Sequence, residues 1–189
     1  MFEVELTAEV NNPVEVYKKL QEFSDFQRLK YFDRYFDKEN DLEHKEQELR
    51  VRIKENQNTG ELKSVLTLKD SPFDKKTRSK PEYETVVEEP EQAVVLLDKL
   101  GFRQKISYNK YCDFFAFRYS GRDIEVSYVT FDEIPETFIE IETLVNEESQ
   151  TPEAFKVVYE LLEKLNVPQA DLTTLMYQTR IHTARKGNL

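Results

Sequence analysis

The dominant pattern in this chain is a repeat of two, in which polar and apolar side chains alternate along most of its length. Residues 2–10 alternate strictly, and residues 49–54 do the same. Alternation of this kind indicates a β-strand with one apolar and one polar face. Turn residues at Gly60 and at Ser120-Gly121 predict two hairpins. Further strands are expected at residues 31–37, 61–69, 80–88, 103–109, 112–119, 122–131 and 137–144.

Three helices are predicted from their start and stop signals. Asn12-Pro13-Val14-Glu15 has the residue order of a capping box with proline at the first helical position. Pro90 opens a second helix, and Gly101 ends it in the left-handed conformation that glycine adopts readily. A third begins at Thr151-Pro152-Glu153, and a last short helix is expected after Asp171.

These elements predict one α+β domain over residues 1–179, followed by a frayed basic tail at residues 180–189. Eight or nine strands with few helices favour an antiparallel sheet closed into a barrel, because closure removes exposed strand edges. Thirteen Phe and ten Tyr provide apolar area for a core and exclude a disordered chain.

Composition also limits the kinds of binding partner and the cellular compartment that we expect for this protein. The formal net charge of −10 disfavours binding to nucleic acid. The single cysteine, Cys112, excludes an intrachain disulfide and a cysteine-based zinc site. The apolar stretches are far shorter than the roughly 20 residues that span a bilayer, and the N-terminus lacks a secretory signal. The sequence therefore predicts a cytoplasmic protein without a membrane partner, as a monomer or homodimer.

Charged residues recur in pairs two positions apart, and residues so spaced share one face of a strand. Such pairs can lie on solvated outer faces. If they point into a closed barrel, acids and bases share a lumen, which is costly without compensation. Divalent cations and a polyphosphate would compensate both charge types, as in a phosphoryl-transfer site. The pairs are Glu3 and Glu5, Arg50 and Arg52, Glu82 and Glu84, and Glu140 and Glu142, with Lys69 at the end of another strand.

The order and spacing of these segments resemble the CYTH family, also called triphosphate tunnel metalloenzymes, over residues 2 to about 177. No single segment is specific, but together they follow the family's order. The segments are Glu3-Val4-Glu5-Leu6-Thr7, Asp33-Arg34-Tyr35-Phe36-Asp37, Leu49-Arg50-Val51-Arg52, Leu66-Thr67-Leu68-Lys69, Thr77-Arg78 with Glu82-Tyr83-Glu84, Leu100-Gly101-Phe102 and Phe138-Ile139-Glu140-Ile141-Glu142.

The resemblance implies an eight-stranded antiparallel tunnel with helices outside it, Mg²⁺ or Mn²⁺, and a triphosphate substrate. Implied metal ligands are Glu3, Glu5, Asp132, Glu140 and Glu142; implied triphosphate ligands are Arg50, Arg52, Lys69 and Lys110; and implied catalytic residues are Glu82, Glu84 and Lys69. The place of Asp132 requires a shortened hairpin before Phe138, and without that gap Thr130 takes its place.

Departures from the family pattern concern lumen cations. Thr7 stands where the family has a lysine, and Cys112 stands where it usually has an arginine after Lys110. The cations that could compensate for these two missing charges are Lys105, Arg118 and Arg122. A lone cysteine in an aromatic strand is most simply a small core residue.

Three functions stay open on these residues. The resemblance implies a class IV adenylate cyclase-like enzyme, which converts ATP to cyclic AMP and pyrophosphate. The alternative is a triphosphatase acting on inorganic, thiamine or nucleoside triphosphate. The second alternative is a module that binds triphosphate or polyphosphate without turnover, because Thr7 and Cys112 replace cations.

Overall fold

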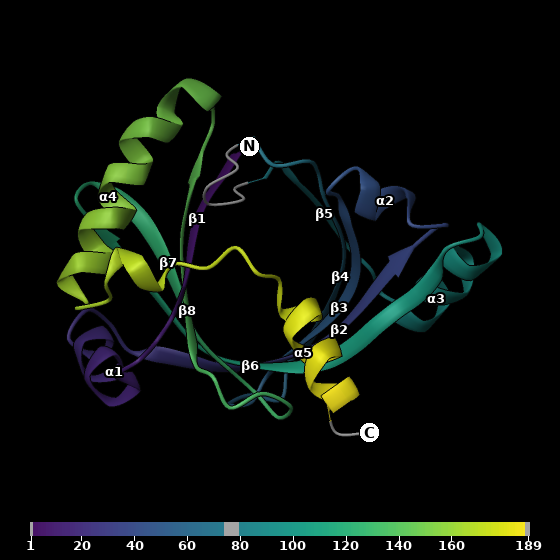
Figure 1. Ribbon diagram of the computed structural model, residues 1–189, viewed down its shortest axis with the longest axis horizontal. Helices are drawn as coiled ribbons and strands as arrows, with labels where there is room; N and C mark the ends of the chain where they lie inside the picture. The colour runs from purple at the N-terminus through teal and green to yellow at the C-terminus, as the bar shows by residue number, and fades with distance from the viewer. Residues whose placement is uncertain (1, 74–79, 188–189) are drawn as a thin grey trace.

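A computed structural model describes residues 2–73 and 80–187, and eight strands in these ranges form one antiparallel sheet (Figure 1). The strands are β1 (Phe2–Glu9), β2 (Phe26–Asp37), β3 (Glu48–Asn56), β4 (Leu62–Lys69), β5 (Glu82–Val86), β6 (Arg103–Tyr119), β7 (Arg122–Phe131) and β8 (Phe138–Val145). Their order across the sheet is β1-β8-β7-β6-β2-β3-β4-β5. The predicted eight-stranded antiparallel α+β fold is confirmed, with the sheet curled into a half-barrel.

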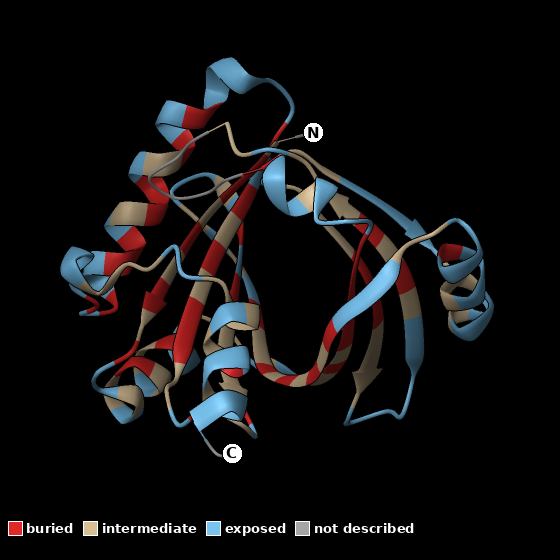
Figure 2. Ribbon diagram, turned by 45° about the vertical axis from the view of Figure 1, so that its right-hand side comes forward, coloured by how far each residue is buried: buried red, intermediate tan, exposed pale blue. Residues whose placement is uncertain are grey.

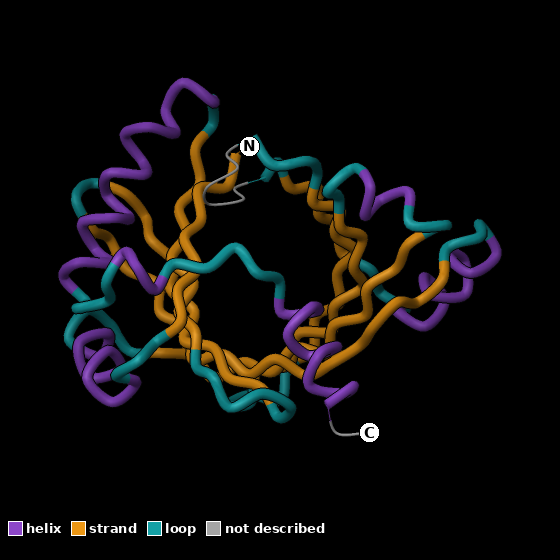
Figure 3. The backbone as a smooth tube through the Cα atoms, viewed as in Figure 1, coloured by secondary structure: helices purple, strands orange, loops and turns teal. Residues whose placement is uncertain are grey.

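The two edge strands, β1 and β5, come together without a continuous ladder. In the described part of the chain, one isolated bridge between Phe2 and Pro81 joins the two edges of the sheet. Figure 3 shows the strands curving around a central opening, with helices on the outer side of the curve and the C-terminal helix at the rim of the opening. Closure is therefore less complete than the predicted barrel, and the brevity of β5 limits the exposed edge. The expected Thr77-Arg78 segment lies outside the described residues.

The strands differ in detail from the sequence prediction. The segments expected at 103–109 and 112–119 form one continuous strand, β6, which pairs with β2 along its first part and with β7 along its second. The 120–121 turn is confirmed, with φ of +47° at Ser120 and +81° at Gly121.

Helices cover the outer face of the sheet. Helices α1 (Pro13–Gln21) and α4 (Thr151–Lys164) pack on the side formed by β1, β7 and β8, and α3 (Pro90–Lys99) packs on β2, β3 and β4. Leu6 and Ile141, for example, are buried in one cluster with Leu162 of α4. Figure 2 shows buried residues along the strands and on the inner side of α4. The face of β1 and β8 that packs on α4 is therefore apolar, and their opposite face carries Glu3, Glu5 and Glu142 into the interior. The inward faces of β2 and β6 differ, because they also carry the buried aromatic residues Tyr31, Tyr35 and Tyr108.

Helix boundaries follow the predicted signals with one difference in capping. Pro13 opens α1, but the Asn12 side chain donates to Glu15 Oε2 at 2.7 Å rather than capping the backbone. Gly101 follows α3 with φ of +92°, as predicted. Short helical turns lie at Asp41–His44 (α2), Glu148–Gln150 and Gln169–Asp171. None of the described helices combines the length and apolar character needed to cross a bilayer.

The C-terminal region is ordered structure over most of the expected tail. After Asp171 the chain crosses the front of the opening in Figure 1 and enters α5 (Tyr177–Gly187). Ile181 is fully buried, and Arg185 makes two hydrogen bonds to Glu133, at 2.6 and 2.8 Å. The prediction of a frayed tail is therefore wrong for residues 180–187, because this segment has an apolar face that the sheet covers.

Candidate active site

The inward faces of the strands line a cavity of about 470 Å³. Each predicted charge pair points into it, so these pairs are not solvated outer faces. Strand parity thus brings together predicted residues from six strands, namely β1, β3, β4, β5, β6 and β8. The predicted residues that line the cavity are Glu3, Glu5, Arg50, Arg52, Lys69, Glu82, Glu84, Lys110, Glu140 and Glu142.

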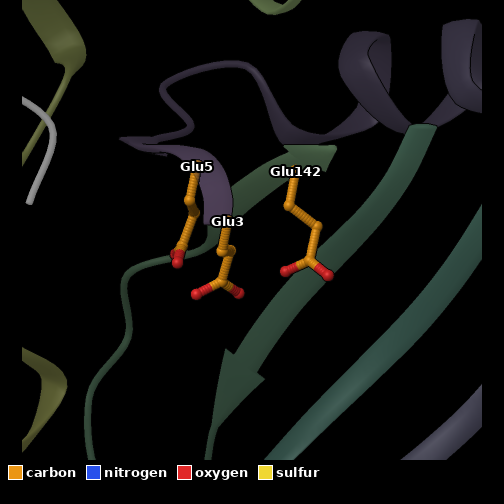
Figure 4. A group of neighbouring side chains, drawn as sticks. All are labelled: Glu3, Glu5 and Glu142. Carbon is orange, nitrogen blue, oxygen red and sulfur yellow. The ribbon is translucent and has the colours of Figure 1, made fainter. Parts of the chain in front are cut away.

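An acidic cluster occupies one wall of the cavity. Glu5 on β1 lies directly opposite Glu142 on β8, and Glu3 is two residues earlier on the same face. Each of these three residues offers a carboxylate oxygen within 4.8 Å of the others (Figure 4). Burial, opposed by Lys69 and reinforced by Glu5, raises the pKa of Glu3 to about 7. Burial together with Glu3 and Glu5 also raises the pKa of Glu142. A cation placed among these carboxylates would relieve their repulsion.

Lys69 already provides part of that positive charge. Its ammonium lies 2.9 Å from Glu3, 3.5 Å from Glu5 and 3.3 Å from Glu82. These contacts connect β4 and β5 to β1, across the gap between the two edge strands of the sheet. Burial acts to raise the pKa of Glu82, but Lys69 and Arg50 lower it, so Glu82 is ionised. Lys69 therefore stands where acids from both edge strands meet.

The opposite wall carries the arginines of β3. Asp33 on β2 accepts two hydrogen bonds from Arg52, both at 2.6 Å, and is fully buried. Arg50 is 9% exposed, forms no ion pair with any described residue, and has a buried Nε without a hydrogen-bond partner. Lys54 continues the same face and lies 3.7 Å from Glu84. Arg50 is therefore a buried cation with unused hydrogen-bonding capacity.

Glu140 and Asp132 lie apart from the three-carboxylate cluster. Lys110 contacts both oxygens of Glu140, at 2.8 and 2.6 Å, and lowers its pKa against the effect of burial. Asp132 is exposed and accepts a hydrogen bond from the Tyr111 hydroxyl at 2.9 Å. The structure does not bring Asp132 into the cavity, because it lies beyond β7, whose inward residues include Glu125 and Ser127.

The structure shows the surroundings of Thr7 and Cys112, the two residues that stand where the family has cations. Thr7 lines the cavity and donates a hydrogen bond to Glu5 at 3.0 Å. Cys112 is 1% exposed within an apolar cluster, and burial raises the pKa of its thiol to about 12. The interpretation of Cys112 as a core residue is confirmed.

The predicted compensating cations do not line the cavity. Lys105 bonds to Asn40 instead, and Arg118 and Arg122 also lie elsewhere. Lys54 and Lys80 are additional lumen cations, and Lys80 bonds to Glu48 at 2.6 Å.

Sequence reasoning missed several residues of the cavity for different reasons. Lys54 follows Arg52 by two positions and could have been found by parity alone. Glu125 lies opposite Glu142, a pairing that needs the register of β7 and β8. Lys80 and residues 173–178 enter the lining from irregular or helical segments, where no repeat marks them.

Comparisons with known proteins agree with this architecture. The sequence profile of the CYTH domain matches residues 1–177. The PH1819 protein from Pyrococcus horikoshii OT3 is 29% identical, with a TM-score of 0.82 over 96% of this chain and 99% of that one. A search of curated protein sequences finds no match.

Two further structures share the fold at lower identity. A protein from Vibrio parahaemolyticus, provisionally assigned as an adenylate cyclase, is 18% identical, with a TM-score of 0.78 over 97% of this chain and 98% of that one. A provisionally assigned adenylyl cyclase from Hippeastrum, in which triphosphatase activity dominates, is 20% identical, with a TM-score of 0.65 over 100% and 96%. Because the family profile spans nearly the whole chain, this protein belongs to the CYTH domain family.

Proposed function

We propose that this protein is a divalent-metal-dependent enzyme that acts on a triphosphate inside its tunnel. The observation that carries the proposal is the facing of two opposite charge clusters across one cavity: the carboxylates of Glu3, Glu5 and Glu142, and the guanidinium groups of Arg50 and Arg52. The carboxylates alone would call for a cation, and the arginines alone would call for an anion. A metal–triphosphate complex complements both at once.

The acidic cluster fits Mg²⁺ or Mn²⁺. Its donors are all carboxylate oxygens, the hard ligands that these ions prefer. A cationic group, the Lys69 ammonium, already lies against Glu3 and Glu5. Burial, with Glu5 and Glu82 adding to it, raises the pKa of Glu3 in spite of Lys69, so a further cation would stabilise the ionised carboxylates. Glu3, Glu5 and Glu142 would hold the ion, whereas Glu140, two residues earlier on β8, is paired with Lys110. When bound, the ion would neutralise phosphate charge and acidify a coordinated hydroxyl or water.

The remaining predicted residues take roles that follow from their contacts. Arg50 offers an unpartnered Nε–H group to phosphate oxygens, and Arg52 and Lys110 add donors whose charges are already partly neutralised. Lys69 would bind phosphate oxygens and stabilise charge as it develops. Ionised Glu82, with Glu84 two residues away, would orient the attacking hydroxyl or water and accept its proton.

Hydrolysis of a triphosphate is the reaction that the lining favours. Its tyrosine rings are engaged by protein groups, since Arg52 lies 4.4 Å from the Tyr31 ring and Tyr35 stacks with Tyr108 at 5.7 Å. These rings are therefore already packed against protein groups, and most of the other lining residues are charged. Such a lining suits a triphosphate better than it suits a base. The dominant triphosphatase activity of the Hippeastrum protein of the same fold supports this choice.

Cyclisation of ATP is the second candidate, favoured by one observation. Leu144 and Leu175 line the cavity and are 55% and 50% exposed. Such apolar side chains offer a purine a surface at the mouth while the triphosphate occupies the charged interior.

The test is an incubation of the protein with inorganic triphosphate, thiamine triphosphate and ATP, in Mg²⁺ and in Mn²⁺ separately, with products resolved by anion exchange. Free phosphate with pyrophosphate or a diphosphate establishes a triphosphatase, and cyclic AMP with pyrophosphate establishes a cyclase. No product together with metal-dependent stabilisation by triphosphate establishes the binding module.

A pair of variants checks where the metal acts. Glu3→Ala with Glu5→Ala should abolish metal-dependent thermal stabilisation, whereas Glu9→Ala, on the same strand but outside the cavity lining, should retain it. Full stabilisation of the double variant would refute the assignment of the metal cluster.

A further inference from the structure

Asp33 is a fully buried carboxylate placed against the wall of the cavity. Its Oδ1 accepts from Arg52 Nε and its Oδ2 from Arg52 Nη2, both at 2.6 Å. This is the bidentate geometry in which guanidinium and carboxylate match best. Burial acts to raise the pKa of Asp33, but Arg52 lowers it, so the pair is ionic. The charge of Arg52 is therefore cancelled inside the protein, before any ligand arrives.

The two arginines of β3 differ in this respect, although they share one face of one strand. Arg50 forms no ion pair with the described residues, and its Nε lacks a hydrogen-bond partner. Both residues are less than a tenth exposed and both line the cavity. The difference between them is thus set by Asp33, which lies opposite Arg52 in the ladder of β2 and β3.

The pairing also fixes the plane of the Arg52 guanidinium. A guanidinium has five N–H donors, and Asp33 takes two of them. The Tyr31 ring supports the same group, with its centroid 4.4 Å from the guanidinium carbon. The three remaining N–H groups are consequently held in a fixed direction by two contacts on different sides. Such preorganisation lowers the cost of aligning a phosphate for reaction.

We infer that Asp33 is a positioning residue for the reaction, which locks the orientation of Arg52 and cancels its charge, so that Arg50 is the principal electrostatic anchor of the triphosphate. The inference rests on the proposed function. It assigns unlike roles to two arginines that sequence spacing makes equivalent. Arg52 directs hydrogen bonds with little net attraction, whereas Arg50 supplies the attraction.

The test is Asp33→Asn, compared with Asp37→Asn as a matched control. Asp37 is a buried carboxylate on the same strand, but it bonds to backbone N–H groups of Lys38, Leu42 and Glu43 outside the cavity. The dissociation constant for inorganic triphosphate with Mg²⁺ is measured by calorimetry, and the turnover rate is measured at saturating triphosphate.

Asp33→Asn frees the charge of Arg52 and loosens its orientation. We expect triphosphate to bind about tenfold more tightly and to turn over about tenfold more slowly. A purely structural role cannot produce tighter binding together with slower turnover. Asp37→Asn should lower the melting temperature but leave both quantities within about twofold of the wild type, which is the size of change that an unrelated site allows.

Arg50→Gln gives a second arm that does not depend on the folding of Asp33→Asn. It removes an unpaired buried charge, so it should fold, and triphosphate binding should weaken by more than about tenfold. Adding Asp33→Asn to Arg50→Gln should recover about tenfold of that loss, because Arg52 then supplies a free charge.

The possible results distinguish failure of the proposed function from failure of the role assigned to Asp33. Absence of triphosphate binding by the wild type refutes the proposed function. Binding by the wild type, with binding unchanged or weakened in Asp33→Asn, refutes the role of Asp33 alone. Unimpaired binding in Arg50→Gln refutes the ranking of the two arginines.

Discussion

Replacing Glu3 by Gln should stabilise the metal-free protein at alkaline pH, although it removes a charged partner of Lys69. Glu3 is 7% exposed, and its pKa rises from 4.5 to about 7 on folding, first through burial and then through Glu5, against the attraction of Lys69. A displacement of this size corresponds to about 3 kcal/mol between the protonated and ionised forms. Gln resembles the protonated form, so the variant avoids that cost.

The direction of the pH dependence follows from the raised pKa. Below about pH 4.5 Glu3 is protonated in both the folded and the unfolded chain, and the substitution changes little. As pH rises towards and through 7, the wild type loses stability because the folded state must ionise a buried carboxyl group. At pH 8 in EDTA we expect Glu3→Gln to unfold roughly 6–12 °C above the wild type, for a domain of this size.

Glu140→Gln is the matched control with the opposite expected sign. Lys110, itself 5% exposed, contacts both Glu140 oxygens and lowers the pKa of Glu140 despite burial. Stability from this pair is present above the unfolded pKa of about 4.5 and is lost as pH falls through the folded value. Removing one partner of a buried pair costs about 3–5 kcal/mol. Glu140→Gln should therefore melt well below the wild type at pH 8.

Both variants are measured by thermal denaturation between pH 4 and 8, in EDTA and again in excess Mg²⁺. The ion should stabilise the wild type and remove most of the advantage of Glu3→Gln, because it neutralises the same carboxylates. If Glu3→Gln melts at or below the wild type in EDTA at pH 8, then the acidic cluster is not short of positive charge and the electrostatic argument for the metal is wrong.

Further predictions concern the cation wall and the departures from the family pattern. Lys69→Met should bind Mg²⁺ about tenfold more tightly in calorimetry, because no ammonium competes for Glu3 and Glu5, and weaker Mg²⁺ binding would contradict this. Cys112→Arg restores a family cation in sequence, yet it should destabilise the protein by roughly 3 kcal/mol or more in urea, because the position is a sealed apolar cluster. Asp132→Asn should leave Mn²⁺ affinity within about twofold of the wild type, and a larger loss would place this exposed residue in the site.

The alternation of polar and apolar residues was enough to predict the fold class and most of the charged residues that line the cavity. Because strand side chains point to opposite faces in turn, the spacing of Glu3 from Glu5 and of Arg50 from Arg52 is enough to say which charges share a face. Which face is inward is not local information. The apolar faces of β1 and β8 are covered by α4, and this packing turns the charged faces inward.

The positions of Asp132 and Glu140 depend on more than the parity of one strand. Asp132 requires a gap in the hairpin before β8, and the chain instead places it at the surface beside Tyr111. Glu140 shares a strand face with Glu142, but Lys110 from β6 takes it as a partner. Both outcomes depend on how neighbouring strands align, which a repeat of two within one strand does not specify.

The sequence by itself determined the strand faces, the helix starts at Pro13 and Pro90, and the types of charge available for chemistry, because backbone geometry and side-chain chemistry are local properties. The tertiary structure alone decided which charges meet. It gave Arg52 a buried carboxylate and left Arg50 without one among the described residues, and it set Lys69 among acids from both edges of the sheet. Electrostatic interactions depend on distance and burial, and both arise only when strands remote in sequence pack together.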